Sequence, residues 1–519
     1  MLEDFMNEPL TDFSEASNRD AFQAALDKVK SQLGRTYPLV IGGERVTLES
    51  TFTSVNPARP NEVIGYFADG TADHVDQAIE VAAQAFEGWK KVSPEERSGY
   101  LRQVAAEMRR RKHEFSGMMV LEVGKSWIEA DADTAEAIDF LEYYARQILE
   151  LSDSSHRLAA YEPERLKLKY IPLGVGAIIP PWNFPCAIAT GMMSAAVVSG
   201  NTVLFKPAEQ SPAIAYMVSE LFWNAGLPDG VLNFLTGPGE VVGARMVEHP
   251  QTRFVAFTGS REVGTQIYAK SSVVQPGQKW LKRAILEMGG KDAVVVDETA
   301  DLEEAAQGIV ASAFGFQGQK CSAGSRAIIV DLVYDKVRDR VIDLAKEIKI
   351  GAPDRGADVY LGPVIDTDAM NKIMQYIEIG KQEGELALGG DRYQTDENGY
   401  FIQPTIFDEV PPDAHIAQEE IFGPVLTLIR VRDFDEAIEV ANSTDYGLTG
   451  AVYTKDPSRI EQAQEDYHVG NLYFNRKCTG ALVGVHPFGG FNMSGTDSKA
   501  GGPDYLTLFT QAKSIAEKL

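Results

Sequence analysis

The sequence predicts an α/β protein with two doubly wound α/β domains and a small β flap. Short apolar strands alternate with helices from Gly174 to Leu286, and a second alternating set runs from Ala293 to Phe474. Strands that are each followed by a crossover helix form a parallel sheet, which binds ligands at the carboxyl ends of its strands. A charge-alternating segment, Arg157 to Tyr170, precedes the first set and predicts an exposed β unit that pairs most easily with another chain.

The first third of the chain is mainly helical in pattern. We expect an amphipathic helix over Phe22–Leu33, short strands and turns over Val40–Phe67, and long helices over Ala72–Lys91, Pro94–Phe115 and Ser126–Leu151. A proline suits the first turn of a helix, where its missing N–H has no intrahelical partner to lose. The helices carry ordinary apolar faces and exposed charges, so we interpret them as scaffold.

Each alternating set supplies five predicted strands. The first comprises Gly174–Pro180, Asn201–Lys206, Val231–Leu235, Phe254–Phe257 and Ala284–Leu286. The second comprises Ala293–Val296, Arg326–Val330, Val425–Val431, Thr449–Tyr453 and Asn471–Phe474. Helices are expected between them, including Ala213–Ala225, Glu240–His249, one that begins at Arg261 and one over Ala305–Phe316. The two sets predict two separate sheets.

The chain is acidic and too long for one simple core. Its 519 residues predict about two to four domains. With 49 basic and 75 acidic residues the net charge is −26, which repels nucleic acid and anionic membranes, so we exclude both as partners. The longest run of small and apolar residues, Cys186 to Val198, is too short to span a bilayer.

Cysteine and histidine usage predicts a cytoplasmic protein without a metal site. Three cysteines, Cys186, Cys321 and Cys478, are too few to staple an extracellular protein of this length. The acidic N-terminus lacks the basic start and apolar core of a secretory signal. None of the seven histidines has a paired spacing and no Cys-x-x-Cys occurs, so we expect no metal.

Cys321 is the candidate nucleophile. It lies among Gly, Ser and Gln in the segment Phe314 to Arg326, where nothing bulky limits access. The adjacent Lys320 supplies a positive charge that favours a thiolate. The alternative is an incidental small residue in a loop.

Two further residues suit acyl chemistry. Glu287 ends a predicted core strand, and two glycines follow Met288. Burying a carboxylate there costs free energy unless it has a function or a partner. Glu287 is therefore a candidate base, and a structural ion pair is the alternative. Asn183 lies between prolines at the end of the first strand and is a candidate oxyanion donor, with a plain turn as the alternative.

A phosphate site is indicated at Thr258–Gly259–Ser260. This tripeptide follows a strand and precedes a helix that contains Gly264, so the N–H groups of the helix start and the Ser260 hydroxyl suit a pyrophosphate. An ordinary N-cap is the alternative. Gly237, Gly239 and Gly243 form G-x-G-x-x-x-G, one residue longer than the dinucleotide fingerprint, and are weak support.

Five ordered motifs resemble the aldehyde dehydrogenase superfamily. They are Pro181–Pro185 (PWNFP), Leu286–Lys291 (LEMGGK), Phe314–Cys321 (F-x-x-x-G-Q-x-C), Glu420–Pro424 (EIFGP) and Pro487–Gly490 (PFGG), and the resemblance covers about residues 35–515. It implies a Rossmann-like NAD-binding domain at 1–155 and 171–287, a catalytic domain at 288–490, and an oligomerisation flap at 156–170 and 491–519.

The resemblance also implies the mechanism and the cofactor. Cys321 attacks an aldehyde, Asn183 and the Cys321 N–H hold the oxyanion, and Glu287 activates the water that hydrolyses the thioester. The cofactor is NAD rather than NADP, because Glu209 would repel a 2′-phosphate. The residues implied for cofactor binding are Trp182, Lys206, Glu209, Gly259, Ser260, Gly264, Glu420 and Phe422.

Two further stretches narrow the implied substrate. Arg476–Gly484 and Thr496–Tyr505 resemble the branch of the family that oxidises L-glutamate γ-semialdehyde, the open form of 1-pyrroline-5-carboxylate, in proline breakdown. The resemblance places the substrate carboxylate on Ser322, Gly480 and Ala481, and the aliphatic chain between Phe184 and Phe488. A tight turn without a ligand is the alternative for Gly480 and Ala481.

The resemblance implies partners and leaves alternatives open. The flap predicts a homo-oligomer, at least a dimer, and association with a separate proline dehydrogenase is open. The other functions considered are an NAD-dependent dehydrogenase of another short semialdehyde and an inactive cofactor-binding relative. A coenzyme A-acylating enzyme is disfavoured, because it has no need of a base such as Glu287 for hydrolysis.

Overall fold

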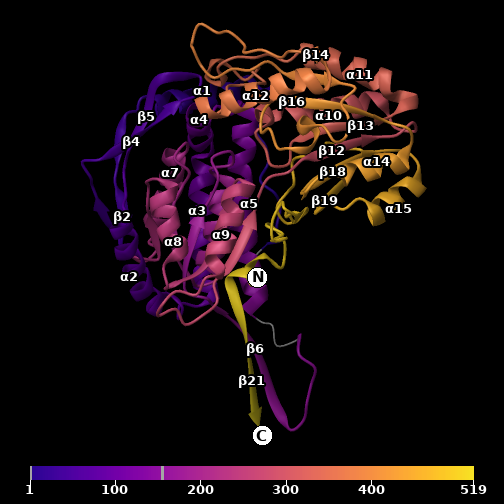
Figure 1. Cartoon of the computed structure of the whole chain (residues 1–519). Coiled ribbons are helices and arrows are strands. Elements are labelled where there is room, and N and C mark those ends of the chain that lie inside the picture. The colour runs from indigo at the N-terminus through magenta and orange to yellow at the C-terminus, as the bar shows by residue number, and fades with distance from the viewer. Residues whose placement is uncertain (1–2, 153–156) are drawn as a thin grey trace.

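The computed structural model describes residues 3–152 and 157–519. Two α/β units lie side by side, and a two-stranded flap projects from the lower end of the first (Figure 1). The expected boundary between residues 155 and 156 lies outside the described residues. Both parallel sheets that the sequence predicts are present.

The first unit contains nine helices and most of the N-terminal strands. Its helices are α1 Ala16–Lys30, α2 Ala72–Trp89, α3 Pro94–Arg110, α4 Lys112–Glu122, α5 Trp127–Ser152, α6 Ala187–Val198, α7 Pro212–Asn224, α8 Ala244–Glu248 and α9 Arg261–Ser272 in the described residues. Its strands are β1 Arg35–Tyr37, β2 Leu39–Ile41, β3 Glu44–Val46, β4 Thr51–Asn56, β5 Arg59–Ala68, β7 Val175–Ile179, β8 Thr202–Phe205, β9 Leu232–Phe234, β10 Thr252–Thr258 and β11 Arg283–Glu287.

The second unit and the flap complete the chain. The helices are α10 Leu302–Phe314, α11 Asp331–Lys346, α12 Thr367–Glu383, α13 His415–Gln418, α14 Phe434–Ala441 and α15 Pro457–Asp466. The strands are β12 Asp292–Val296, β13 Gly324–Val330, β14 Glu385–Leu388, β15 Thr405–Asp408, β16 Val425–Val431, β17 Tyr446–Gly447, β18 Thr449–Tyr453, β19 Asn471–Phe474 and β20 Phe491–Asn492. The flap consists of β6 Glu164–Pro172 and β21 Thr510–Lys518.

The first sheet is doubly wound. Its strand order is β11-β10-β7-β8-β9-β2-β3, with β7 to β11 parallel and the β2–β3 hairpin added antiparallel at one edge. Alternate residues of these strands enter two cores: Ile178 packs with helices α3 to α7, and Ala177 packs with α2, α8 and α9. The strand order reverses at β7, so the ligand crevice of this sheet lies at the carboxyl ends of β7, β8 and β10.

The second sheet has the order β14-β15-β16-β13-β12-β18-β19 and is parallel except for β14. Helices α10 and α11 cover one face, and α12, α14 and α15 cover the other. Strands β14 and β15 were not predicted; β14 is a half-exposed edge strand without a clear apolar run. The expected helix over Pro94–Phe115 is two helices, because Arg111 leaves helical geometry at φ −108°.

The flap boundary at residue 491 is wrong. Strand β21 begins only at Thr510 and pairs antiparallel with β6 along its whole length. Residues 494–498 instead run beside β11, where the Met288 N–H donates to the Ser494 carbonyl and the Thr496 N–H donates to the Leu286 carbonyl. Phe509 is fully buried in the first core. The C-terminal stretch therefore supports the site before it reaches the flap.

Glu122 is a buried anchor of this core. Its two carboxylate oxygens accept the N–H groups of Ala213 and Ile214 at the start of α7, at 2.8 and 2.9 Å, and the Ser54 hydroxyl at 3.1 Å. The side chain thus satisfies helix N–H groups that water does not reach.

We predict that Glu122→Ala destabilises the protein by about 3 kcal/mol, because two buried N–H groups lose their acceptor. Calorimetric unfolding measures the effect. Glu80→Ala, which removes an exposed glutamate on α2, is the matched control and should leave the transition unchanged; equal transitions for both variants would contradict the anchoring role.

Candidate active site

Cys321 lies in the loop between α10 and β13, at the border of the two units. After α10 the chain makes a 3-10 turn in which Phe316 and Gln317 have φ of 49° and 58°. This left-handed pair is held from outside, because the Gln317 Nε2 donates to the Gly124 and Pro363 carbonyls at 3.1 and 2.8 Å. The turn ends the helix and directs the chain into the Cys321 loop.

Asn183 connects the first sheet to this loop. It follows β7, is 4% exposed, and its Nδ2 donates to the Gln319 carbonyl at 2.9 Å. The Gln319 side chain in turn accepts the Ile365 N–H at 2.9 Å. One amide hydrogen of Asn183 is engaged by that bond, and its second is available to a ligand beside Cys321.

The surroundings of Cys321 do not favour a thiolate in the ligand-free chain. Burial and the carboxylates of Asp292, Glu287 and Glu420 raise the pKa of the Cys321 thiol well above its ordinary value. The prediction that Lys320 favours the thiolate is wrong here, because its ammonium bonds Glu129 at 2.7 Å instead. Although Lys320 is next to Cys321 in sequence, its ammonium does not bond the Cys321 sulfur.

Glu287 ends β11 and is buried close to the Cys321 loop. Its Oε1 accepts the Ser498 hydroxyl at 2.8 Å, whereas Oε2 has no hydrogen-bond partner among the described residues. Burial raises the pKa of Glu287 to about 8, and the Ser498 hydrogen bonds oppose that rise. The chain after Glu287 runs against the nucleophile loop: a Cβ on Gly290 would overlap the Cys321 carbonyl oxygen.

One side of the cofactor crevice is built by the ends of β8 and β10. Lys206, directly after β8, donates to Glu209 at 2.7 Å. Ser260 caps α9 by accepting the Val263 N–H at 3.3 Å, which leaves its hydroxyl hydrogen available to an anion. A Cβ on Gly259 would press on the Phe257 ring, so this turn needs glycine. An ammonium, a carboxylate and a capped helix start fit a ribose and a pyrophosphate.

The opposite side of the crevice comes from the second unit. The Gly290 N–H donates to Glu420 Oε1 at 3.1 Å, and Phe422, at φ 61°, meets the Trp182 ring edge to face at 5.6 Å. Gly264 lies under Met288, where any side chain would overlap the sulfur. Contacts thus join Glu420 and Phe422 of the second unit to the chain at Gly290 and Trp182.

Two aromatic rings and a buried lysine pack together near the Cys321 loop. The ring centroids of Phe184 and Phe316 are 6.4 Å apart, and the Lys125 ammonium lies 3.9 and 4.5 Å from them. Lys125 also pairs with Asp133 at 2.8 Å, and both side chains are fully buried. Sequence reasoning missed Lys125; a lysine after a glycine in a helical region carries no signal of burial.

The loop Cys478–Gly484 borders the residue that follows the nucleophile. The Cys478 thiol contacts the Ser322 carbonyl at 3.4 Å, and Gly480 has φ 79°. At the far end of the loop, the Val483 carbonyl accepts the side-chain amide of Asn7 at 3.0 Å. Phe488 is fixed by two backbone hydrogen bonds with Ala500, at 2.7 and 2.8 Å. Asn7 and Ser498 were not predicted to support the site.

These features define an aldehyde-oxidising enzyme site, and the chain belongs to the aldehyde dehydrogenase family, whose profile matches residues 45–515. The matched span covers every predicted catalytic residue, the whole second sheet and the first sheet except β2 and the first residue of β3. None of the helices in the described ranges 3–152 and 157–519 is long and apolar enough to cross a membrane.

Several relatives match over the full length of this chain. The chain is 58% identical over 517 residues to the 1-pyrroline-5-carboxylate dehydrogenase of Geobacillus thermodenitrificans, with 100% of both chains covered. The 1-pyrroline-5-carboxylate dehydrogenase from Thermus with bound NAD matches with a TM-score of 0.97, 52% identity and 100% of both chains covered. Proline utilization A from Bdellovibrio bacteriovorus matches at 44% identity and a TM-score of 0.97, covering 99% of this chain and 53% of that one.

Proposed function

We propose that this protein is an NAD-dependent dehydrogenase that oxidises L-glutamate γ-semialdehyde to L-glutamate in proline catabolism. The observation that carries the proposal is the convergence of Cys321, Glu287 and the Cys478–Gly484 loop at the border of the two sheets. The full-length similarity to 1-pyrroline-5-carboxylate dehydrogenases supports it.

The contacts support the following catalytic roles. The Cys321 thiolate attacks the aldehyde carbon, and the resulting oxyanion accepts hydrogen bonds from the free amide hydrogen of Asn183 and from the Cys321 N–H; loss of the aldehyde hydrogen as hydride leaves a thioester. NAD, when bound, supplies the hydride acceptor and a positive charge that favours the thiolate. Glu287, with Oε2 unengaged, then takes a proton from the water that cleaves the thioester.

The cofactor roles divide between the two units. We assign Lys206 and Glu209 to the adenosine ribose, and Ser260, with Gly259 and Gly264 shaping the turn, to the pyrophosphate. Glu420, Phe422 and Trp182 would hold the nicotinamide half. Glu209 disfavours a 2′-phosphate, which supports NAD over NADP.

The substrate roles use small residues and aromatic rings. We assign Phe184 and Phe488 to the aliphatic chain, and Ser322 with the N–H groups of Gly480 and Ala481 to the α-carboxylate. Backbone N–H groups at a left-handed glycine such as Gly480, φ 79°, suit an anion without adding a charged side chain.

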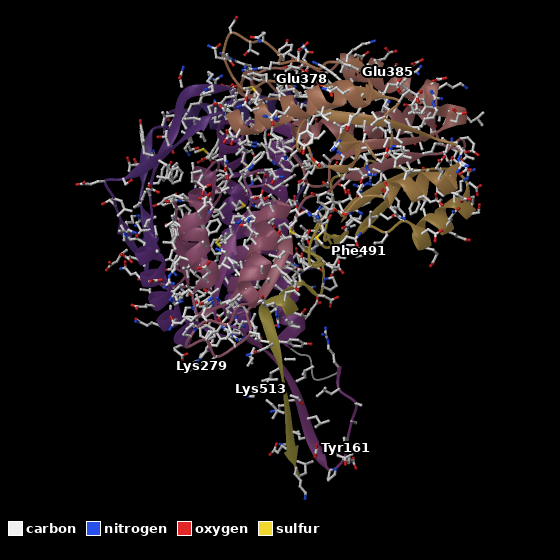
Figure 2. All side chains as sticks on the ribbon, viewed as in Figure 1. Tyr161, Lys279, Glu378, Glu385, Phe491 and Lys513 are labelled. Atoms are coloured by element: carbon white, nitrogen blue, oxygen red, sulfur yellow. The ribbon has the colours of Figure 1, made fainter. Side chains whose placement is uncertain are left out.

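We also propose a homo-oligomer, at least a dimer, held by the flap. Strand β21 exposes most of its side chains and every side chain of β6 is at least partly exposed, and Figure 2 shows Lys513 on β21 and Tyr161 shortly before β6 in the projecting part of the chain. Elsewhere in the first unit Tyr268, Val273, Val274 and Leu281 are each more than half exposed. Unpaired strand edges and exposed apolar side chains favour pairing with a second copy.

The compartment and a further partner are also proposals. Three free cysteines, one of them the nucleophile, suit a reducing cytoplasm. The similarity to half of proline utilization A supports association with a separate proline dehydrogenase.

We predict that the protein produces NADH from NAD and 1-pyrroline-5-carboxylate. The rate should fall by about a thousandfold or more in Cys321→Ala, because that variant lacks the proposed nucleophile. Absorbance of NADH measures the rate, with a panel of simple aldehydes alongside. Turnover of other aldehydes alone would favour a dehydrogenase of another short semialdehyde. NAD binding without turnover of any aldehyde would favour an inactive relative.

We predict that Ser498→Ala shifts the pH dependence of kcat for thioester hydrolysis. Glu287 acts as a base only when ionised, and the Ser498 hydroxyl stabilises that form at 2.8 Å. Losing it raises the pKa of Glu287 further above about 8, so the ascending limb should move up by about one pH unit. Ser498→Thr, which keeps the hydroxyl, should restore the profile; a uniform loss of rate at all pH values would contradict this role.

We predict that the purified protein is at least dimeric at micromolar concentration. Deleting residues 511–519, most of β21, should reduce the mass of the particle in solution to that of a smaller assembly or a single chain. The reason is that β6 then has no partner strand with which to form the flap. Light scattering measures both proteins. A stable monomer for the intact chain would refute the oligomer.

A further inference from the structure

Arg476 holds the carbonyl side of the loop that we assign to the substrate carboxylate. Its Nη2 donates to the Thr479 carbonyl at 2.8 Å and to the Gly480 carbonyl at 2.9 Å, and its Nε donates to the Lys477 carbonyl at 3.3 Å. The guanidinium lies over the Tyr473 ring of β19, 4.4 Å from the centroid. One arginine thus holds three backbone carbonyls on one side of the loop.

This contact determines where two N–H groups point. In a trans peptide the C=O and the N–H of the same unit point in opposite directions. The Thr479 carbonyl shares its peptide with the Gly480 N–H, and the Gly480 carbonyl shares its peptide with the Ala481 N–H. Because Arg476 binds both carbonyls, both N–H groups are directed away from the guanidinium and are presented together, the arrangement that binds a carboxylate.

The start of the loop is fixed relative to the nucleophile. The Cys478 N–H donates to the Ser312 hydroxyl on α10 at 3.2 Å, and the Cys478 thiol contacts the Ser322 carbonyl at 3.4 Å. The two N–H groups therefore keep a constant distance from Cys321, provided that Arg476 keeps their peptides in this orientation.

We propose that Arg476 is a positioning residue for substrate selection: it turns the Gly480 and Ala481 N–H groups toward the α-carboxylate of the substrate and does not bind that carboxylate itself. The guanidinium nitrogens Nη2 and Nε are already engaged with loop carbonyls. The inference rests on the proposed function. It means that the preference for an aldehyde with an α-carboxylate depends on a residue that does not touch the substrate.

Two substitutions of Arg476 distinguish a positioning role from attraction of the substrate by its charge. Arg476→Lys keeps the positive charge and loses the planar fork, whereas Arg476→Gln loses the charge. We expect both variants to raise KM for L-glutamate γ-semialdehyde about tenfold and to leave KM for propanal within about twofold, since propanal has no carboxylate. The product L-glutamate, titrated calorimetrically, should bind about tenfold more weakly to both. Arg432→Lys, on an exposed arginine of the second unit, is the matched control.

Each alternative outcome has a distinct meaning. Wild-type KM and glutamate affinity in Arg476→Lys, with loss only in Arg476→Gln, would mean attraction by charge and would overturn positioning. Equal effects on both aldehydes would mean a merely structural role. Ala481→Pro removes one of the N–H groups with Arg476 intact; an unchanged KM for the semialdehyde would also overturn the proposal. A wild-type enzyme with no preference for the semialdehyde over propanal would overturn the proposed function itself.

Discussion

The whole site depends on the short crossing between the two sheets. Strand β11 ends at Glu287 and β12 begins at Asp292, so only four residues, Met288 to Lys291, separate the last strand of one sheet from the first strand of the other. The two glycines in this crossing let the chain pass beside the Glu420 carboxylate and the Cys321 carbonyl, where a Cβ would overlap either one. The short crossing therefore keeps Glu287 close to the Cys321 loop and to Glu420.

The strands could be predicted because each is a short apolar run, buried on both faces and bounded by glycine, proline or polar residues. The candidate catalytic residues were proposed from the sequence because they lie within motifs of consecutive residues. The supports of the site could not: Ser498 reaches Glu287 across 211 residues and Asn7 reaches Val483 across 476. No local pattern marks such a partner, since its side chain is ordinary for a surface loop. The pairing of β6 with the far end of the chain was expected from the family resemblance, since no local pattern indicates it.

The wrong expectation for Lys320 has a physical consequence. A lysine next to a cysteine in sequence need not act on its sulfur, and here the ammonium bonds Glu129 on α5. Burial and the carboxylates of Asp292, Glu287 and Glu420 raise the pKa of the Cys321 thiol, so the surroundings of the sulfur act against the thiolate that a nucleophile needs. Under the proposed function, bound NAD would supply a positive charge that favours the thiolate.

Recognition of a carboxylate through backbone N–H groups, as proposed, would account for the composition of the loop near Ser322. Two N–H groups hold a carboxylate through their direction and lose strength when that direction changes. Small residues such as Gly480 and Ala481 leave the N–H groups uncovered, yet they cannot hold a loop in one conformation without help. The order must come from outside the loop residues themselves, and the hydrogen bonds of Arg476 on one side and of Asn7 at the far end constrain the loop. Under the proposed function, the residues that touch the ligand would depend on their orientation, and the residues that determine that orientation would not touch the ligand.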